Sequence, residues 1–258
     1  MLFHVLARKA YARNLQYRGS HALNTFASAI FGFIYVSIWV GIGENQNLGE
    51  YGISGMISYI AFNQTILSLT VFVTNGLGLE ASVRSGQISI DMMRPVHLFY
   101  MTMSREWGQI GYHLVYKAFP IYLAYTVLLS MQLPDRFVTW LLTAAAVAFA
   151  AYISICIQYL IGVCALWTTE SRWFSWVNYA LSTLLSGFLI PIEWLPGWLQ
   201  AISRYSFYPY LQYYPARIYL EYDNGIVLLG SILWCAGLTA ICLSATAIVR
   251  RKLEVQGG

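Results

Sequence analysis

The chain has 258 residues and a net charge of +4, and 58% of its residues are hydrophobic while only 10% are charged. A mean hydropathy of +0.56 argues against one or two ordinary soluble domains, whose surfaces need far more charged residues. The composition instead indicates a protein that folds in lipid.

The first segment, residues 1–20, mixes basic and apolar side chains. It contains Arg8, Lys9, Arg13 and Arg18 among Leu2, Phe3, Leu6, Ala10 and Leu15. A cleavable signal would place its basic residues ahead of a short apolar core, and this arrangement is missing. We therefore expect the segment to stay on the protein as an amphipathic helix lying in the membrane interface. A frayed basic tail is the alternative.

Long uncharged runs follow along the chain. They cover residues 19–43, 51–79, 138–169, 173–192 and 224–249, and a sixth run, 107–134, is interrupted only by Lys117. Each run reaches or exceeds the roughly 20 residues that a helix needs to cross a bilayer. The sequence therefore predicts an all-α integral membrane protein with six transmembrane helices in a single domain, residues 1–258.

A charged segment, residues 80–95, separates the second and third runs. It carries Glu80, Arg84, Gly86, Asp91, Arg94 and Pro95. Glu80 and Arg84 are four apart and can form an ion pair along a helix, which Gly86 should interrupt. Residues 87–93 can then form a second short helix that ends before Pro95.

The same segment has an apolar stripe at helical spacing, made of Leu79, Val83, Ile88 and Met92. We therefore predict a short amphipathic element on the cytoplasmic face. An ordinary interfacial loop is the alternative.

The segment at residues 191–223 is rich in proline, tryptophan and tyrosine. Its aromatic residues recur at helical spacing around Pro191, Pro196 and Trp198, which predicts one or two short helices that dip into the outer interface as a re-entrant element. A plain aromatic loop is the alternative. Glu193, at the membrane edge, is interpreted either as a helix cap or as a polar contact that lines an exit path.

The basic residues are distributed by side of the membrane. With the N-terminus inside, eleven of the 15 Lys and Arg residues lie in cytoplasmic segments, and six acidic residues lie outside. This asymmetry predicts that both termini are cytoplasmic. Because the basic residues do not gather into one patch, the net charge does not indicate a nucleic-acid partner.

Two other functions were weighed from single residues. Lys117, with His113 one turn before it, could face a translocation path, and a secondary transporter would need such a group near the midplane. The Gly-x-Ser-Gly pattern around Ser54 could indicate an intramembrane enzyme, but no histidine is placed to activate Ser54. The four cysteines show no Cys-x-x-Cys spacing, and we expect no metal site.

Two stretches together resemble the permease subunit of bacterial ABC type-2 exporters. They are LEASVRSGQISIDMMRPV, similar to the coupling segment of that family, and SGFLIPIEWLPGWLQAISRYS, similar to its outer element. The resemblance implies an exporter of amphiphilic drugs, lipids or glycoconjugates in the bacterial inner membrane. It is closest to a subgroup with two permeases and one ATPase, so a second permease chain, identical or a sister, is implied as a partner.

The resemblance also implies separate ATPase subunits that bind at residues 80–95 and hold ATP and Mg²⁺. The sequence agrees, because a phosphate-binding loop requires a Gly-Lys pair and the chain contains none. We therefore expect no cofactor on this chain and no enzymatic activity of its own.

Overall fold

The apolar runs form helices because a helix satisfies its own backbone hydrogen bonds where water is excluded. The computed structural model describes residues 2–71, 75–168 and 170–256, and all regular elements within these ranges are helices. The longer ones are α1 (Leu2–Asn14), α2 (Arg18–Gly43), α3 (Gly52–Thr70), α6 (Leu98–His113), α7 (Phe119–Leu128), α8 (Phe137–Thr168), α9 (Arg172–Leu185) and α12 (Leu228–Gln256). The short ones are α4 (Leu79–Arg84), α5 (Gln87–Met93), α10 (Gly197–Arg204) and α11 (Tyr213–Tyr219).

Single helical turns complete the chain at η1 (Leu15–Tyr17), η2 (Asn75–Gly78), η4 (Ile192–Trp194), η5 (Tyr208–Leu211) and η6 (Gly225–Val227). The π-helical segment η3 (Leu114–Ala118) joins α6 to α7 without a break, so Leu98–Leu128 is one helical run. This run contains most of the predicted third span.

Four helical runs in the described residues are long and apolar enough to cross a membrane. They are His21–Gly43, Phe137–Thr168, Gly225–Arg250 and the apolar run that contains α3 (Gly52–Thr70). The prediction of a helix over the whole run 173–192 is wrong in its outer part, because α9 has only 14 residues and ends at Leu185. Such a helix is about 21 Å long, short of the roughly 30 Å hydrocarbon core.

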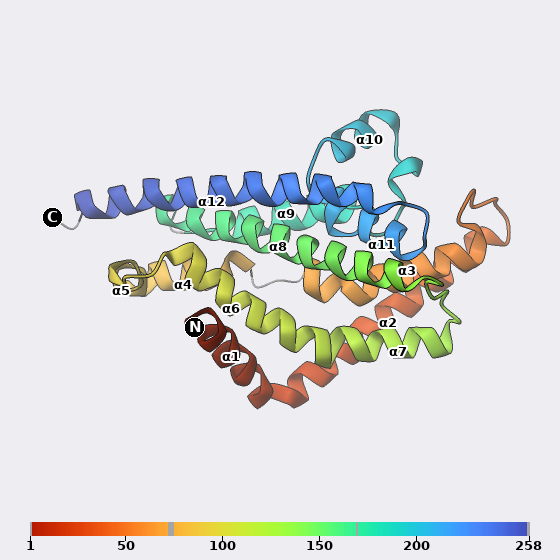
Figure 1. The fold of residues 1–258 in the computed structure, drawn as a ribbon, viewed down its shortest axis with the longest axis horizontal. Coiled ribbons are helices and arrows are strands. Elements are labelled where there is room, and N and C mark those ends of the chain that lie inside the picture. The colour runs from red at the N-terminus through yellow and green to blue at the C-terminus, as the bar shows by residue number, and fades with distance from the viewer. Residues whose placement is uncertain (1, 72–74, 169, 257–258) are drawn as a thin grey trace.

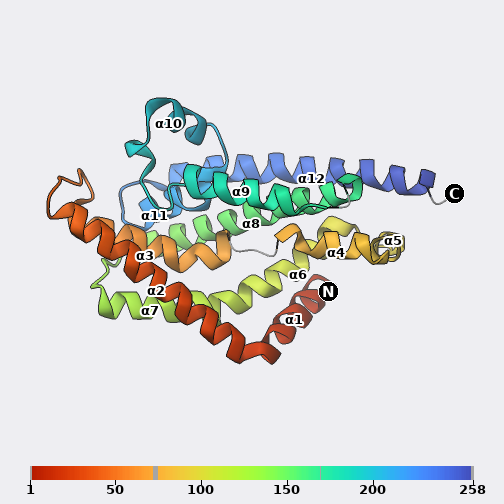
Figure 2. The ribbon, with the colours of Figure 1, turned by 180° about the vertical axis from the view of Figure 1, so that it is seen from behind.

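Helices α3 and α8 form the centre of the bundle. In α3, every residue from Gly55 to Thr70 except Ile57 is buried inside the protein, whereas only 11% of the apolar part of α2 and 17% of that of α12 are buried. Figures 1 and 2 show α8 in the middle of the bundle and α2 crossing obliquely over α3 at its edge. The apolar side chains of α2 and α12 therefore face outward, as expected for helices that contact lipid or another apolar chain.

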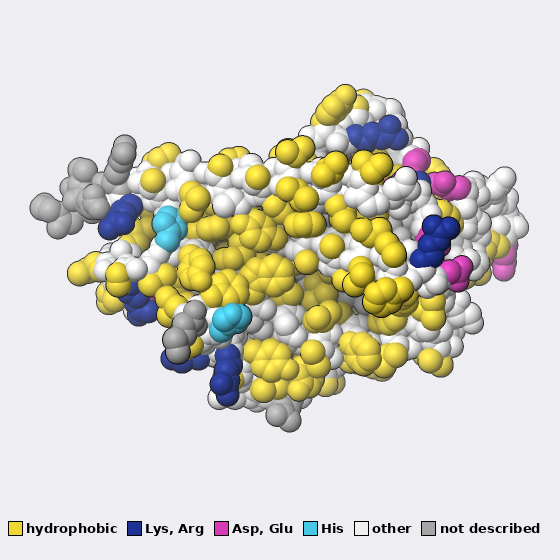
Figure 3. Space-filling view, in the orientation of Figure 1, with side chains coloured by type: hydrophobic (Ala, Val, Ile, Leu, Met, Phe, Trp, Pro, Cys, Tyr) yellow, Lys and Arg dark blue, Asp and Glu magenta, His cyan; other side chains and the backbone are white. Residues whose placement is uncertain are grey.

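The two ends of the bundle differ in charge. The N-terminus, the C-terminal end of α12 and the helices α4 and α5 lie at one end, and the loops after α2, α7 and α11 lie at the other (Figure 1). On the face drawn in Figure 3, the first end shows Lys and Arg side chains, and Asp and Glu side chains gather at the second end together with further Lys and Arg. We call these the basic end and the acidic end, and the orientation of the two ends in a membrane stays a prediction.

Helix α1 packs directly on α6. A Cβ atom at Gly108 would lie 2.1 Å from the backbone oxygen of Ala7, so the two helices approach as closely as they do only because position 108 is glycine. Within residues 1–20, where a helix is predicted, α1 ends at Asn14 and its Ala10 is buried. Its place in a membrane interface stays a prediction.

Candidate functional site at the basic end of the bundle

The charged segment between α3 and α6 folds as its sequence predicts. Helix α4 ends at Arg84, Gly86 takes a left-handed conformation with φ of 72°, and α5 follows from Gln87 to Met93. The guanidinium of Arg84 lies 2.9 Å from the carboxylate of Glu80. Arg94 is extended, as the residue before Pro95 must be to avoid a clash with the proline ring.

The predicted apolar stripe of this element faces the bundle. Leu79 and Ile88 are buried, and Val83 and Met92 pack against the same apolar core as α8. Asp91 is also buried, and its carboxylate lies 3.5 Å from Arg94. The element is therefore fixed to the protein along one side.

The opposite side of α5 is apolar and exposed. Ile90 is 55% exposed and Met93 is 84% exposed, at the basic end of the bundle. Two large apolar side chains side by side on a charged element are unusual unless another surface covers them. Ile90 and Met93 are the exposed large hydrophobic side chains of residues 80–95, and they do not belong to the predicted apolar stripe.

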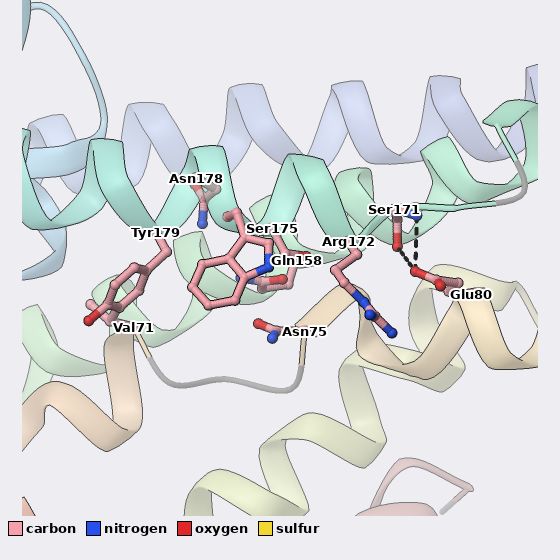
Figure 4. Close-up of a pocket in the computed structure, with 10 residues that line it drawn as sticks. Val71, Asn75, Glu80, Gln158, Ser171, Arg172, Ser175, Asn178 and Tyr179 are labelled. Atoms are coloured by element: carbon pink, nitrogen blue, oxygen red, sulfur yellow. Dashed lines mark hydrogen bonds between the residues drawn. The ribbon is translucent and has the colours of Figure 1, made fainter.

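Glu80 points toward the loop between α8 and α9. Its carboxylate accepts hydrogen bonds from the backbone amide of Ser171, at 2.9 Å, and from the Ser171 hydroxyl, at 2.7 Å (Figure 4). These bonds lower the pKa of Glu80 below its ordinary value. The Glu80 carboxylate thus joins the start of α4 to the connection between α8 and α9, and a role of Glu80 in coupling to an ATPase stays a prediction.

This bond should make the attachment of α4 sensitive to acid. Because the folded state lowers the pKa of Glu80, the charged form contributes stability above the ordinary glutamate value of 4.5, and the contribution is lost as the pH falls through the folded pKa. We expect Glu80→Gln to melt at a lower temperature than the wild type at pH 7, and we expect the difference to shrink as the pH falls below 4.5.

Thermal unfolding of the purified protein between pH 3.5 and pH 7 measures this difference. Glu170→Gln is the control, because the Glu170 carboxylate is 45% exposed and lies 3.9 Å from Arg84, so its loss should change little. A pH-independent difference between wild type and Glu80→Gln would contradict the prediction.

Helix α4 is joined to α3 by a turn that crosses α8 at very short range. Gly76, Leu77 and Gly78 all have positive φ, and the backbone amide of Gly76 donates to the side-chain oxygen of Gln158, at 2.9 Å. A Cβ atom at Gly162 of α8 would lie 2.2 Å from the backbone oxygen of Gly76. The turn therefore lies directly on the backbone of α8, and a glycine is needed there.

A pocket of about 650 Å³ opens between this turn and α9 (Figure 4). It is lined by Val71, Asn75, Glu80, Gln158, Ser171, Arg172, Ser175, Trp176, Asn178 and Tyr179. Its volume is in the range of small-molecule sites. Glu80 and Ser171, which are bonded to each other, both line the pocket. The pocket therefore lies directly beside the charged segment of residues 80–95.

The chain directly after α9 is non-helical, but its backbone carbonyl groups have hydrogen-bond partners. Five consecutive carbonyls accept hydrogen bonds from other elements: Leu185 from Ser203, Ser186 from Tyr213, Gly187 from Tyr59, Phe188 from Asn63 and Leu189 from Trp39. Irregular backbone within a membrane is tolerated only when protein satisfies it in this way. The break after α9 is therefore part of the fold.

The predicted outer helices are present as η4, α10 and α11. Pro191 and Pro196 precede η4 and α10, as proline commonly does at a helix start. Trp198 is 68% exposed on α10, whereas Leu199 beside it is buried. Helix α10 stands out from the side of the bundle (Figure 1), and a dip into the membrane stays a prediction.

Glu193 belongs to an ion cluster at the acidic end. Its carboxylate accepts hydrogen bonds from Tyr213 and, at 2.6 Å, from Arg217. Arg217 also binds the carboxylates of Glu50 and Asp223. Glu193 is therefore part of an ion cluster, and its place on an exit path stays a prediction. No local pattern in the sequence indicates Arg217 as its partner.

Lys117 lies in η3, which packs against α2 and α3. It is not among the described residues that line the pocket beside α9, nor those that line an apolar cavity of about 740 Å³ between α3, α6–α7 and α8. A role for Lys117 in a translocation path stays a prediction. The Ser54 hydroxyl accepts a hydrogen bond from the side chain of Gln132. No hydrogen bond from Ser54 to a histidine is found among the described residues.

Comparison with known proteins identifies a family. The family described as "ABC-2 family transporter protein" matches residues 27–255, from within α2 to the last turn of α12. A search of curated proteins finds no match.

Proposed function

The chain belongs to the ABC-2 transporter family, and from this premise we propose that it is the membrane-spanning permease of an ATP-driven exporter whose ATPase is a separate subunit. The observation that supports this proposal most directly is the exposed pair Ile90 and Met93 on α5, at the basic end of the bundle. In this proposal the pair is the surface that the ATPase subunit grips.

The way in which α4 and α5 are attached supports a coupling role. The stripe of Leu79 and Ile88 is buried, Glu80 is bonded to Ser171, and the turn at Gly76 rests on α8. A displacement of α5 therefore moves α8 and the start of α9 together. ATP binding and hydrolysis, with Mg²⁺, take place on the partner and shift the bundle between two states.

The remaining features of the proposal follow the family. The chain crosses the bacterial inner membrane six times as a single domain, with both termini in the cytoplasm, and the run Leu98–Leu128 and the short α9 with the segment after it supply the two crossings beyond the four long helices. A second permease chain, identical or a sister, covers part of the exposed apolar surface. The cargo is amphiphilic, and the outer helices η4 and α10 are re-entrant.

A pair of matched substitutions tests the coupling surface. We expect Ile90→Glu combined with Met93→Glu to reduce the amount of ATPase subunit that co-purifies by about tenfold or more, because losing a contact of ~1.4 kcal/mol weakens binding tenfold. The measurement is the ATPase-to-permease ratio after purification in mild detergent, together with transport-linked ATP hydrolysis.

The control is Ile226→Glu, an exposed isoleucine at the acidic end, which should leave the ratio unchanged. A retained ATPase and unchanged hydrolysis in the α5 variant would mean that the coupling surface lies elsewhere. A chain that transports without any nucleotide-hydrolysing partner would contradict the proposed function itself.

A further inference from the structure

A line of uncharged polar side chains runs along α9. Its members are Ser171, Ser175, Asn178, Ser182 and Ser186. The spacing of three or four residues places them on one face of the helix, since Ser171 and Ser186 at its two ends are also in the helical conformation. The line begins in the pocket at the basic end and ends where α9 breaks.

The pocket carries little net charge. Among the described residues that line it, only Glu80 and Arg172 are charged, and the Glu80 carboxylate is already bonded to Ser171 and paired with Arg84. The other polar lining groups are the amides of Asn75, Gln158 and Asn178 and the hydroxyls of Ser175 and Tyr179. These groups can both donate and accept hydrogen bonds, but they do not create a strong electrostatic field that would bind an ion.

Two aromatic side chains line the mouth of the same pocket. Both lie on α9, where Trp176 is 63% exposed and Tyr179 is 44% exposed. Aromatic faces bind the apolar face of a ring or a chain, while amide and hydroxyl groups bind its polar edge. The combination suits a ligand that has both.

The polar line continues into a second, much smaller cavity. The two cavities share Val71 and Tyr179, and the second is lined by Ser182 and Ser186. Ser186 is fully buried, and its hydroxyl has no hydrogen-bond partner among the described residues. A buried hydroxyl without a partner costs free energy, which a water could recover, because the second cavity of about 10 Å³ has room for one water at most in this structure.

We propose that the pocket binds the uncharged, hydroxyl-rich headgroup of an amphiphile, and that the polar line on α9 receives the same headgroup beyond it. This inference rests on the proposed function and specifies its cargo. A charged headgroup would lose its hydration along α9 without meeting an opposite charge there, whereas hydroxyls exchange water for Ser and Asn side chains.

Three ligands with the same chain and different headgroups test this directly. The full-length protein, purified with its partners and placed in lipid nanodiscs without ATP, is titrated with radiolabelled octyl glucoside, octyltrimethylammonium and octyl phosphate below their micelle-forming concentrations. We expect the glucoside to bind at least about tenfold more tightly than either charged ligand, a difference of ~1.4 kcal/mol.

Two tryptophans one turn apart on α9 give a matched pair of variants. Trp176→Ala removes a lining residue and should weaken glucoside binding by about tenfold, the upper range of an aromatic contact. Trp173→Ala removes a tryptophan that is 74% exposed and does not line the pocket, and it should leave binding unchanged.

Each other outcome overturns the inference. Equal or tighter binding of the cation would indicate an aromatic site for cations, and tighter binding of the phosphate would indicate a site built on Arg172. Equal effects of the two variants, or no binding of any ligand, would show that the pocket is not the headgroup site. Because the assay uses no ATP, these results are independent of whether the ATPase binds at α5.

Discussion

Replacement of Arg217 by methionine is expected to lower the free energy of unfolding by about 2–4 kcal/mol, because it strands three carboxylates around an apolar side chain. The Arg217 side chain is only 11% exposed, and its guanidinium bonds to Glu50, to Glu193 and, at 2.9 Å, to Asp223. These partners come from three separate loops at the acidic end. The substitution should therefore loosen the contacts between those loops.

The expected loss of unfolding free energy lies in the lower part of the range for a broken buried ion pair, because the carboxylates keep some contact with water. Glu50 is 51% exposed, Glu193 28% and Asp223 25%. Unfolding of the purified protein by sodium dodecyl sulfate, followed by circular dichroism, measures the change.

Two further variants separate the loss of charge from the loss of shape. Arg217→Lys keeps the charge but cannot reproduce the several directed bonds of the guanidinium, so it should be intermediate. Arg217→Met combined with Glu193→Gln removes one stranded carboxylate and should recover part of the lost stability. Wild-type stability in Arg217→Met would show that the cluster contributes nothing to the fold.

The second large effect is expected at Gly162. A methyl group there would lie 2.2 Å from the backbone oxygen of Gly76 and 2.9 Å from its carbon, and neither backbone can move without shifting the turn or α8. Gly162→Ala should therefore cost about 2–3 kcal/mol, in the range of an overpacked core. The turn carries α4, so we also expect the variant to lose the link between ATP hydrolysis and transport.

Gly237→Ala is the matched control. Gly237 is also in a long helix, α12, and a methyl group at this position would have no neighbour within 4 Å. Since alanine is a better helix former than glycine, the control should be neutral or slightly stabilised. Unfolding free energies and transport-linked hydrolysis of both variants are compared, and equal behaviour of the two would contradict the close contact between the turn and α8.

Helices α4 and α5 show how far local sequence reasoning reaches. Gly86, Pro95 and the spacing of Glu80 and Arg84 indicated two short helices with the observed limits, because each of these signals acts within one or two helical turns. The stripe of apolar residues likewise indicated which side is buried. The bond between Glu80 and Ser171 could not be predicted in this way, because the two residues are 91 positions apart.

The sequence by itself determined that the chain is helical and lipid-embedded, where its charges separate and where α4 and α5 begin and end, since hydropathy and helix breaking are local properties. Only the tertiary structure decided that α9 ends at Leu185 and that Arg217 meets three carboxylates. The break in α9 is stable because donors from α2, α3 and α11 reach its carbonyls, and such long-range partners leave no periodic trace in the sequence.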